Sequence, residues 1–320
     1  MTYRYHNRWV KSSSFGLAIS DVTNNAIVIP RIAGIYPYIH TPIAPKSDIS
    51  FHQACLNRAK WILANYDDIH IMFSGGVDST LVAVYLCSMK TTQKITLTRS
   101  EQSDIDADPK VIEWIQQYAE FEDITLESLH SVTERGGMVI TGTHADSILV
   151  GEFLDDMKDP QIYTDIWDMT PQELIARYTG NTEHWADVQL KKLKPLTDSI
   201  PVAMTAANLA WWIDFSCLWD RDELEFMVQL GMQPPGKGYI AFFNTPEFEG
   251  WSQKDASEKA GVGIDQYKYQ YKELIADILK FEPIWPGKTR FTAMNDQVCT
   301  TTYDFHRVSS ISANWEIVWK

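Results

Sequence analysis

Cysteine is scarce in this sequence. Only four cysteines occur in 320 residues, and they are Cys55, Cys87, Cys217 and Cys299. They stand far apart and form no C-x-x-C pair, so neither a zinc site nor a disulfide framework is indicated. A chain that does not rely on disulfides suits a reducing compartment, and we expect a cytoplasmic protein.

Segments that direct a chain to a membrane are also missing. The first residues, Met1–His6, lack the apolar region of a signal peptide, and no apolar run in the sequence is long enough to span a bilayer. Neither an internal repeat nor a low-complexity tract is present. The sequence therefore predicts a globular protein with no membrane partner.

Positive charge is in short supply too. Lysine and arginine number 28 against 42 acidic residues, which gives a formal net charge of −14. This balance argues against a broad footprint on a nucleic-acid backbone. The densest basic cluster, Lys191, Lys192 and Lys194, is more typical of a solvated face. The length allows one large domain or two smaller ones.

One segment carries the strongest signal. An apolar strand pattern over 69–73 runs directly into Ser-Gly-Gly-Val-Asp-Ser-Thr at 74–80, and an apolar helix pattern follows to Met89. The two glycines let the backbone turn tightly and bring its N–H groups close to a ligand. The start of the helix adds its positive dipole end, and Asp78 can hold a Mg²⁺ that screens phosphate charge. The segment predicts an anion cradle.

This segment resembles the PP-loop signature of the ATP pyrophosphatases, a superfamily that includes asparagine synthetases, GMP synthetases, NAD synthetases and tRNA-thiolating enzymes. It lacks the Gly-Lys-Ser/Thr of the Walker P-loop. The resemblance implies that ATP is cleaved between its α and β phosphates, that an acceptor is adenylated, and that Mg²⁺ takes part. The first-loop positions it implies for nucleotide binding are Phe73, Ser74, Gly75, Gly76, Val77, Asp78, Ser79 and Thr80.

A second segment follows the same plan, since an apolar strand again ends in a glycine and a polar loop at 139–149. It resembles the asparagine synthetase segment Ser-Gly-Glu-Gly-Ala-Asp-Glu-Leu-Phe. The matching residues are Gly142, Ala145, Asp146 and Leu149. In that family the loop contacts pyrophosphate and its aspartate shares Mg²⁺ with the aspartate of the first loop. The resemblance thus implies that Asp146 joins Asp78 as a metal ligand and that Gly142 and Thr143 contact the nucleotide.

The second segment departs from the family at three positions. Thr143 stands where the family has Glu, His144 replaces Gly, and Ser147 replaces Glu. His144 is a candidate phosphate donor or general acid/base, with a surface histidine as the alternative. The adenine is expected near the end of the strand predicted at 94–98, at Leu97 and Thr98.

Three later segments resemble, in the same order, segments of asparagine and β-lactam synthetases. They are Ala241–Asn244 with Glu247 and Phe248, then Lys268–Lys272, then Pro286–Phe291. The last implies that Lys288 is the family's essential lysine, whose ammonium stabilises charge on the acyl oxygen and the leaving phosphate. Arg290 is a second candidate for this role, and a solvated lysine at a turn is the alternative.

Hydrophobic patterns divide the chain into three regions. We expect a small N-terminal β region over 1–50, a nucleotide-binding core over 51–150, and a mostly helical region over 151–320. In the first region a hairpin is predicted over 15–29, and Ser50 is expected to cap a helix that runs to about Tyr66. The helical region is predicted to contain helices that begin at Pro171 and that cover 202–231 and 253–281.

The core alternates strands and helices. Strands are predicted at 69–73, 94–98, 124–128 and 138–142, and helices near 78–89 and 109–120. This alternation predicts an α/β fold with a parallel, Rossmann-like sheet, helices on both faces, and a ligand at the carboxyl edge of the sheet.

The function implied by the resemblance, which covers about residues 69–291, is that of an ATP-dependent, AMP-forming carbon–nitrogen ligase similar to asparagine synthetase. Its acceptor would be a carboxylate of a small molecule or peptide. Glutamine-dependent relatives begin with a catalytic cysteine on a glutaminase domain, but here Thr2 follows Met1. The amine would therefore be free ammonia, ammonia from a partner glutaminase, or a group on the substrate, as in β-lactam synthetases and lasso-peptide cyclases.

Two alternatives stay open. One is an ATP-binding module that has lost catalysis, which the changed positions Thr143 and Ser147 motivate. The other is a PP-loop enzyme that modifies a nucleobase or tRNA, although the acidic charge and the lack of paired cysteines weigh against it, and Cys87 is expected in the core. A homo-oligomer is compatible with the sequence, which leaves the oligomeric state undecided.

Overall fold

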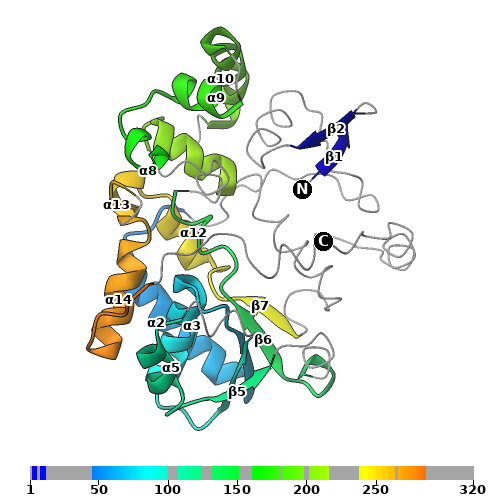
Figure 1. Cartoon of the computed structure of the whole chain (residues 1–320), viewed down its shortest axis with the longest axis vertical. Coiled ribbons are helices and arrows are strands. Elements are labelled where there is room, and N and C mark those ends of the chain that lie inside the picture. The colour runs from blue at the N-terminus through cyan, green and yellow to red at the C-terminus, as the bar shows by residue number, and fades with distance from the viewer. Residues whose placement is uncertain are drawn as a thin grey trace.

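A computed structural model of the chain shows an α/β fold built on a parallel sheet (Figure 1). It describes residues 2–5, 8–11, 45–99, 107–123, 132–150, 161–179, 182–197, 202–215, 238–263 and 266–285. Among these, none of the helices combines the length and the apolar character that crossing a membrane requires.

The sheet has five parallel strands in the spatial order β5-β4-β3-β6-β7. The strands are β3 (Asp68–Met72), β4 (Lys94–Arg99), β5 (Glu120–Asp123), β6 (Met138–Thr141) and β7 (Tyr239–Ala241). In the central register, Ile71 of β3 pairs with Leu97 of β4 and with Ile140 of β6.

The order of the strands reverses beside β3. The chain moves outward from β3 through β4 to β5, then returns to the other side of β3 as β6 and continues to β7. Counted from β3, this is the order 3-2-1-4-5 of one class of doubly wound folds. Ligands of such folds bind in the crevice at the carboxyl ends of the two strands that flank the reversal. Here those strands are β3 and β6, which precede the two loops predicted to form the site.

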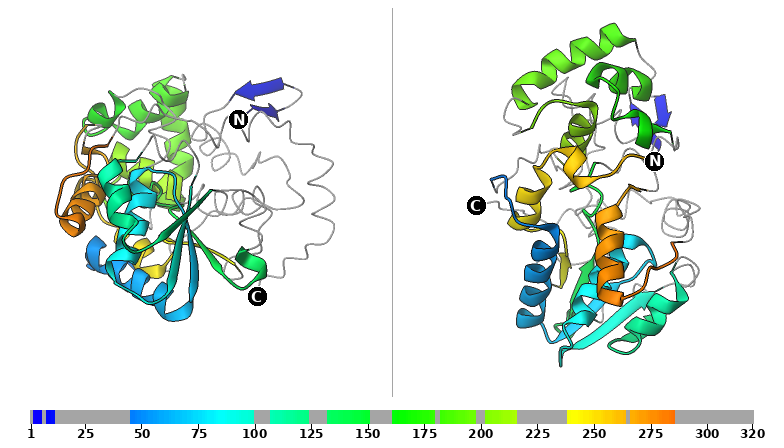
Figure 2. Two further views of the ribbon diagram at one scale, coloured as in Figure 1. Left: turned by 60° about the horizontal axis from the view of Figure 1, so that its bottom comes forward. Right: turned by 90° about the vertical axis from the view of Figure 1, so that its left-hand side faces the viewer.

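Apolar side chains cover one face of the sheet. On β3, Ile69 and Ile71 are fully buried against α2 (Phe51–Asn65) and α3 (Val77–Ser88), and α5 (Pro109–Ile115) packs on the same side (Figure 2). The opposite face carries polar groups. Helices were predicted on both faces of the sheet. Helices α2, α3 and α5 confirm this for one face.

The start of α2 agrees with the prediction. Ser50 is its N-cap, and the Ser50 hydroxyl accepts a hydrogen bond from the Gln53 N–H at 3.1 Å, which satisfies one of the free amides of the first turn. The helix ends at Asn65, next to the predicted end at Tyr66.

The third strand of the sheet is not where it was predicted. It lies at Glu120–Asp123 as β5, whereas 124–128 falls within 124–131, outside the described residues. The helix predicted to reach residue 120 already ends at Ile115. Because β5 is an acidic edge strand with mostly exposed side chains, it lacks the apolar signal of a buried strand.

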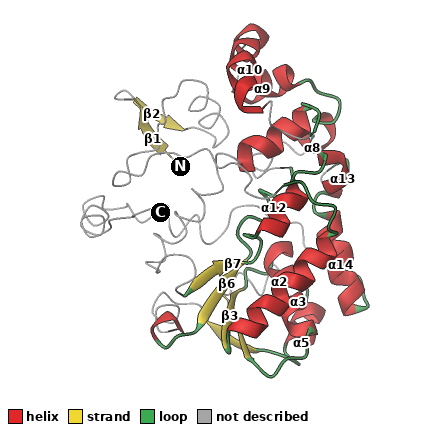
Figure 3. Ribbon diagram, turned by 180° about the vertical axis from the view of Figure 1, so that it is seen from behind, coloured by secondary structure: helices red, strands yellow, loops and turns green. Residues whose placement is uncertain are grey.

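The described residues beyond β6 are mainly helical (Figure 3). The described helices are α8 (Ile162–Asp165), α9 (Pro171–Thr179), α10 (Glu183–Thr197), residues 206–215, α12 (Pro246–Ser252), α13 (Ala256–Lys259) and α14 (Tyr269–Leu279). The start of α9 at Pro171 is as predicted.

One of the predicted C-terminal helices is described only in part, and another is divided into two helices. The helix predicted over 202–231 is described only at 206–215, since 216–237 lies outside the described residues. The stretch 253–281 holds two helices, α13 and α14. The chain turns between them at Gly263, whose φ of 88° is costly for residues with a side chain.

At the N-terminus, β1 (Thr2–Tyr5) and β2 (Arg8–Lys11) form an antiparallel pair. The hairpin predicted over 15–29 lies outside the described residues.

Candidate functional site

The first loop leaves β3 through a turn that requires glycine. Gly75 has a φ of 75°, in the left-handed region that side chains disfavour. The backbone N–H of Ser74 donates to Ser79 Oγ at 3.1 Å, and the two serine hydroxyls lie 3.1 Å apart. Phe73 N donates to Thr98 O at 2.8 Å, which ties the loop to the end of β4. The loop is therefore fixed at the carboxyl edge of the sheet.

The loop ends at the first turn of α3. Gly76 is the N-cap, and no side chain caps the helix, so the first-turn amides face the loop without a serine or aspartate cap. Asp78 lies in this turn, where the helix dipole favours a negative charge.

The second loop lies directly against the first. A Cβ atom added to Gly142 would stand 3.2 Å from Asp78 Cβ and 3.3 Å from Ser79 N. This spacing is tighter than ordinary van der Waals contact, so glycine is what lets the two backbones approach. The structure thus brings together the two loops that the sequence predicted to form one site.

Thr143 belongs to a small network of hydroxyl groups. Its Oγ1 lies 2.9 Å from Thr141 Oγ1, and the Tyr239 hydroxyl lies 3.1 Å from Thr141 Oγ1 and 3.4 Å from Thr143 Oγ1. Thr143 stands where the resembling family has Glu, so this network takes the place of an acidic side chain.

His144 is buried and has a φ of 73°. Such a backbone suits glycine, which is the residue of the resembling family at this position. His144 thus adopts a backbone conformation that is uncommon for a residue with a side chain. The alternative of a surface histidine is wrong.

A lysine joins the aspartates of the two loops. Lys268 Nζ lies 2.8 and 2.6 Å from the two carboxylate oxygens of Asp78, and 2.7 Å from Asp146 Oδ1. Burial by itself lowers the pKa of Lys268, but the carboxylates of Asp146 and Asp78 outweigh it and raise the pKa above its ordinary value. Lys268 is therefore an ammonium ion at neutral pH.

Two tyrosines beside Lys268 also reach the second loop. The Tyr267 hydroxyl donates to Asp146 Oδ1, and the Tyr271 hydroxyl donates to Ala145 O at 2.8 Å. Burial, followed by the nearby charges of Asp78 and Asp146, raises the pKa of Tyr271 well above its ordinary value, so its hydroxyl remains a donor.

Aromatic stacking fixes the start of α14 next to the site. The Tyr271 ring stacks on Phe51 with centroids 4.7 Å apart, and on Phe243 with centroids 5.8 Å apart. Phe243 and Tyr271 belong to the first two of the three later segments that resemble the synthetases. These two segments, far apart in the sequence, therefore pack against each other.

The third of these segments is not described. Lys288 and Arg290 lie outside the described residues, which end at Trp285. The last hydrogen bond before them runs from Ile284 N to Asp108 Oδ2 at 2.7 Å, at the N-cap of α5.

Leu97 and Thr98 lie at the end of β4, beside the first loop. Both are fully buried, Leu97 in the core and Thr98 with its hydroxyl donating to Ile71 O at 3.2 Å. Both lie next to Phe73, and their contact with adenine stays a prediction.

The two aspartates fit a magnesium ion that has only one or two ligands from the protein. They converge on one cation position, at which the Lys268 ammonium now stands. Mg²⁺ prefers oxygen ligands and is usually held by one or two carboxylates together with water and substrate phosphates. Among the described residues no third carboxylate, histidine or cysteine completes a metal cluster. The donor set thus suits an ion that arrives with a nucleotide.

Lys268 and Tyr267 were not among the predicted site residues. The segment 268–272 was recognised for its resemblance, but nothing local in it indicates an ion pair with residues so distant in the sequence. The usable signal was the position of a lysine at the start of a segment that follows both loops in the family's order.

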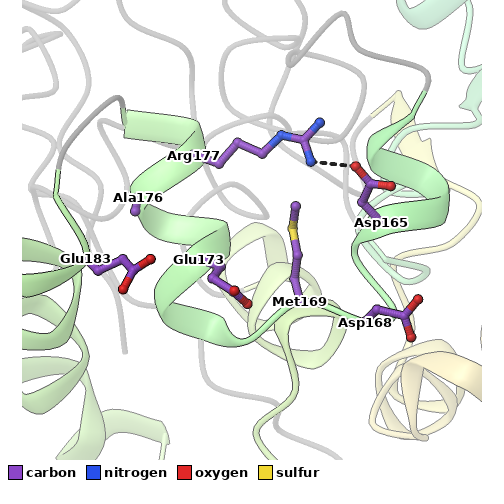
Figure 4. A pocket seen from close by; sticks show the side chains of 7 residues that line it. All are labelled: Asp165, Asp168, Met169, Glu173, Ala176, Arg177 and Glu183. Atoms are coloured by element: carbon purple, nitrogen blue, oxygen red, sulfur yellow. Dashed lines mark hydrogen bonds and ion pairs between the residues drawn. The ribbon is translucent and has the colours of Figure 1, made fainter.

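A separate pocket of about 610 Å³ lies among α8, α9 and α10 (Figure 4). Two of its four acidic residues have structural partners: Glu173 and Thr170 form a capping box at the start of α9, and Asp165 pairs with Arg177 at 2.6 Å. None of the predicted site residues lines it.

The described cysteines are not placed for chemistry. Cys55 and Cys87 are free and buried, and burial raises the pKa of the Cys87 thiol to about 12. The prediction of Cys87 in the core is confirmed. Since the thiolate is the reactive form, neither residue suits a sulfur-transfer role.

The fold and these contacts define an α/β protein with two loops meeting at the carboxyl edge of a parallel sheet. No protein-family model matches the chain, and no match was found among curated proteins.

Proposed function

We propose that this chain is an ATP-dependent ligase that releases AMP and pyrophosphate. In this proposal a carboxylate or carbonyl oxygen of the acceptor is adenylated, and ammonia or an amine then displaces AMP. The single observation that carries the proposal is the meeting of the two loops after β3 and β6, with Asp78 and Asp146 held on one cation position.

The first loop has the donors that a polyphosphate needs. Its glycine turn and the start of α3 direct backbone N–H groups to one place, and Ser74 and Ser79 add hydroxyls. Bound ATP with Mg²⁺ would supply the electrophilic α-phosphate and the pyrophosphate leaving group. Asp78 and Asp146 would hold the metal, while Gly142 and Thr143 would line the pyrophosphate side.

Lysines are proposed to stabilise the negative charge that develops in the reaction. A preorganised ammonium in a site shielded from water stabilises a growing negative charge. Lys288, with Arg290 as second candidate, keeps this role from the resemblance. Lys268 is the ammonium that the described residues place at the loops. His144 remains a candidate acid or base on the second loop.

The partners follow from this chemistry. The acceptor would be a small molecule or peptide with a carboxylate, and the amine would be ammonia, ammonia from a partner glutaminase, or a group of the substrate itself. The acidic chain argues against nucleic acid as substrate.

The test is to identify the nucleotide product. The protein would be incubated with Mg-ATP, ammonium and a small-molecule filtrate of cells. Formation of AMP and pyrophosphate that depends on the filtrate and is lost in Asp78→Asn supports the proposal. ADP and phosphate as products would contradict it.

A nucleotide-binding module without catalysis is the second candidate. It is favoured by Lys268, which fills the cation position, and by the hydroxyl network at Thr143 where the family has Glu. Tight ATP binding without turnover across many acceptors, with and without added ammonium, would favour this candidate over the ligase.

A further inference from the structure

The Lys268 ammonium occupies the position at which the two loops would share a metal ion. We propose that Lys268 is an internal counter-ion that competes with divalent cations for Asp78 and Asp146, so that the free protein takes up Mg²⁺ poorly and binds it together with a nucleotide. This inference rests on the proposed function, because it concerns the metal position assigned there.

The contacts of the ammonium support direct competition. Lysine has three N–H donors, and Lys268 Nζ lies within 2.8 Å of three carboxylate oxygens, two on Asp78 and one on Asp146. These oxygens belong to the same two carboxylates that a metal shared by the loops would use. A metal ion and the ammonium cannot both stand at this point.

Lys268 is held in this position from several sides. Its side chain is only 11% exposed, and its Nζ lies 5.4 Å from the centroid of the Tyr267 ring. Tyr267 also binds Asp146, and Tyr271 anchors the start of α14 to Ala145. The ammonium is thus fixed between the carboxylates by the packing of α14 against the second loop.

The charges explain why a nucleotide would change the outcome. Among the described residues, Asp78, Asp146 and Lys268 together have a formal charge of −1. A metal that displaces the ammonium breaks its ion pairs with both carboxylates, which is unfavourable. Nucleotide phosphates give the displaced ammonium a new anionic partner, so uptake of metal and nucleotide becomes coupled.

The experiment measures Mn²⁺ binding in the absence of nucleotide, by electron paramagnetic resonance of the free ion. The variants are Lys268→Met, which keeps the length of the side chain, and Lys268→Asn, which suits the left-handed backbone at φ 59°. Each is expected to bind one Mn²⁺ at least tenfold more tightly than the unaltered protein. The gain should disappear when Asp146→Asn is added.

Lys280→Met is the matched control. Lys280 ends the same helix with nearly the same backbone conformation, at φ 64°, but it is exposed and makes no ion pair with the described residues. This variant should bind Mn²⁺ like the unaltered protein.

A second measurement uses the unaltered protein, in case neither variant folds by circular dichroism. Reductive methylation followed by mass spectrometry reports how accessible each lysine is. Lys268 should be protected relative to Lys280 without metal, and should lose protection at saturating Mn²⁺.

Two results would overturn the inference. One is Mn²⁺ binding by the unaltered protein as tight as that of folded Lys268 variants. The other is unchanged protection of Lys268 at saturating Mn²⁺. Neither result depends on ATP turnover, so this inference and the proposed function can fail separately. A ligase whose metal site is freely accessible would contradict only this inference. A protein that excludes metal but has no ligase activity would contradict only the proposed function.

Discussion

Two charged clusters lie toward opposite ends of β3. At the carboxyl end, Asp78, Asp146 and Lys268 join two loops. Toward the amino end, Arg135 Nε donates to Asp68 Oδ2 at 2.9 Å, and Arg135 Nη2 lies 2.7 Å from His70 Nε2. Both clusters combine carboxylates with a cation, yet their charges and their positions on the sheet differ.

The amino-end cluster is balanced. The contact of the Arg135 guanidinium, which only donates, and the burial that lowers the pKa of His70 both favour the neutral imidazole, while Asp68 Oδ1 also lies 3.1 Å from His70 Nε2. The charges of Asp68 and Arg135 then cancel, and the Glu122 carboxylate, 4.0 Å from His70 Nδ1, is about half exposed to water. The described residues of the carboxyl-end cluster, two aspartates and one lysine, have a formal charge of −1 and lie at the edge where α/β sheets bind ligands. The comparison supports a structural role for the first cluster and is consistent with the ligand site that we propose for the second.

The largest expected effect is the loss of AMP formation when an aspartate of the carboxyl-end cluster is exchanged, with the matching exchange in the amino-end cluster as control. Asp78→Asn should lower AMP formation by about 100- to 1,000-fold, because it removes a charge that holds the metal position. Asp68→Asn should leave AMP formation within about twofold, because Asp68 is remote from both loops. Pyrophosphate release measures both. Equal losses in the two variants would contradict the division of roles.

The second prediction concerns Arg135. Arg135→Met leaves Asp68 and the buried His70 without their donor, and should lower the free energy of unfolding by about 1–3 kcal/mol. Urea denaturation measures the change, and ATP affinity should stay the same. Lys191→Met, which removes an exposed ion pair with Asp187 on α10, is the control and should cost less than about 1 kcal/mol. A loss of ATP affinity in Arg135→Met would contradict a purely structural role of the amino-end cluster.

Two glycines sharpen the comparison further. In Gly142→Ala the new methyl group presses on Asp78 and Ser79, and in Gly136→Ala the space is open but φ is 85°. Each should destabilise by about 1–2 kcal/mol, the first through overpacking and the second through backbone strain. Only Gly142→Ala should weaken ATP binding, as measured by calorimetry. Equal ATP affinities in the two variants would argue against the contact between the loops as part of the site.

The smallest effect is a pH dependence of stability. Burial, together with Arg135, lowers the pKa of His70, although Asp68 acts in the opposite direction. The unfolded chain therefore takes up a proton at a higher pH than the folded one, and stability should fall as the pH drops below about 6.5, by no more than about 1.4 kcal/mol per pH unit. His70→Gln should reduce this slope in urea titrations between pH 7 and 5. An identical slope in both proteins would rule out His70 as its source.

The first loop was predictable because its signals are local. A strand, a glycine that adopts positive φ at Gly75, and a helix start follow one another within a few residues. The left-handed backbone at His144 was not predicted. The meeting of Asp78 and Asp146 followed from topology, since both loops leave the carboxyl ends of neighbouring parallel strands.

Lys268 was not predictable in the same way. Its contact with Asp78 spans 190 positions, and it depends on how α14 packs on α3 and on the stacking of Tyr271 against both Phe51 and Phe243. The strand β5 was misplaced for a different reason, because two neighbours of Phe121 in this edge strand are glutamates.

The docking of α14 has a consequence for the newly made chain. Synthesis proceeds from the N-terminus, so the two aspartates leave the ribosome long before Lys268, and contacts over such separations form late. The parallel sheet can assemble while the paired carboxylates still lack their ammonium. The site is thus completed only after Lys268 has been synthesised, and a chain released before residue 268 would contain both loops without the residue that joins them.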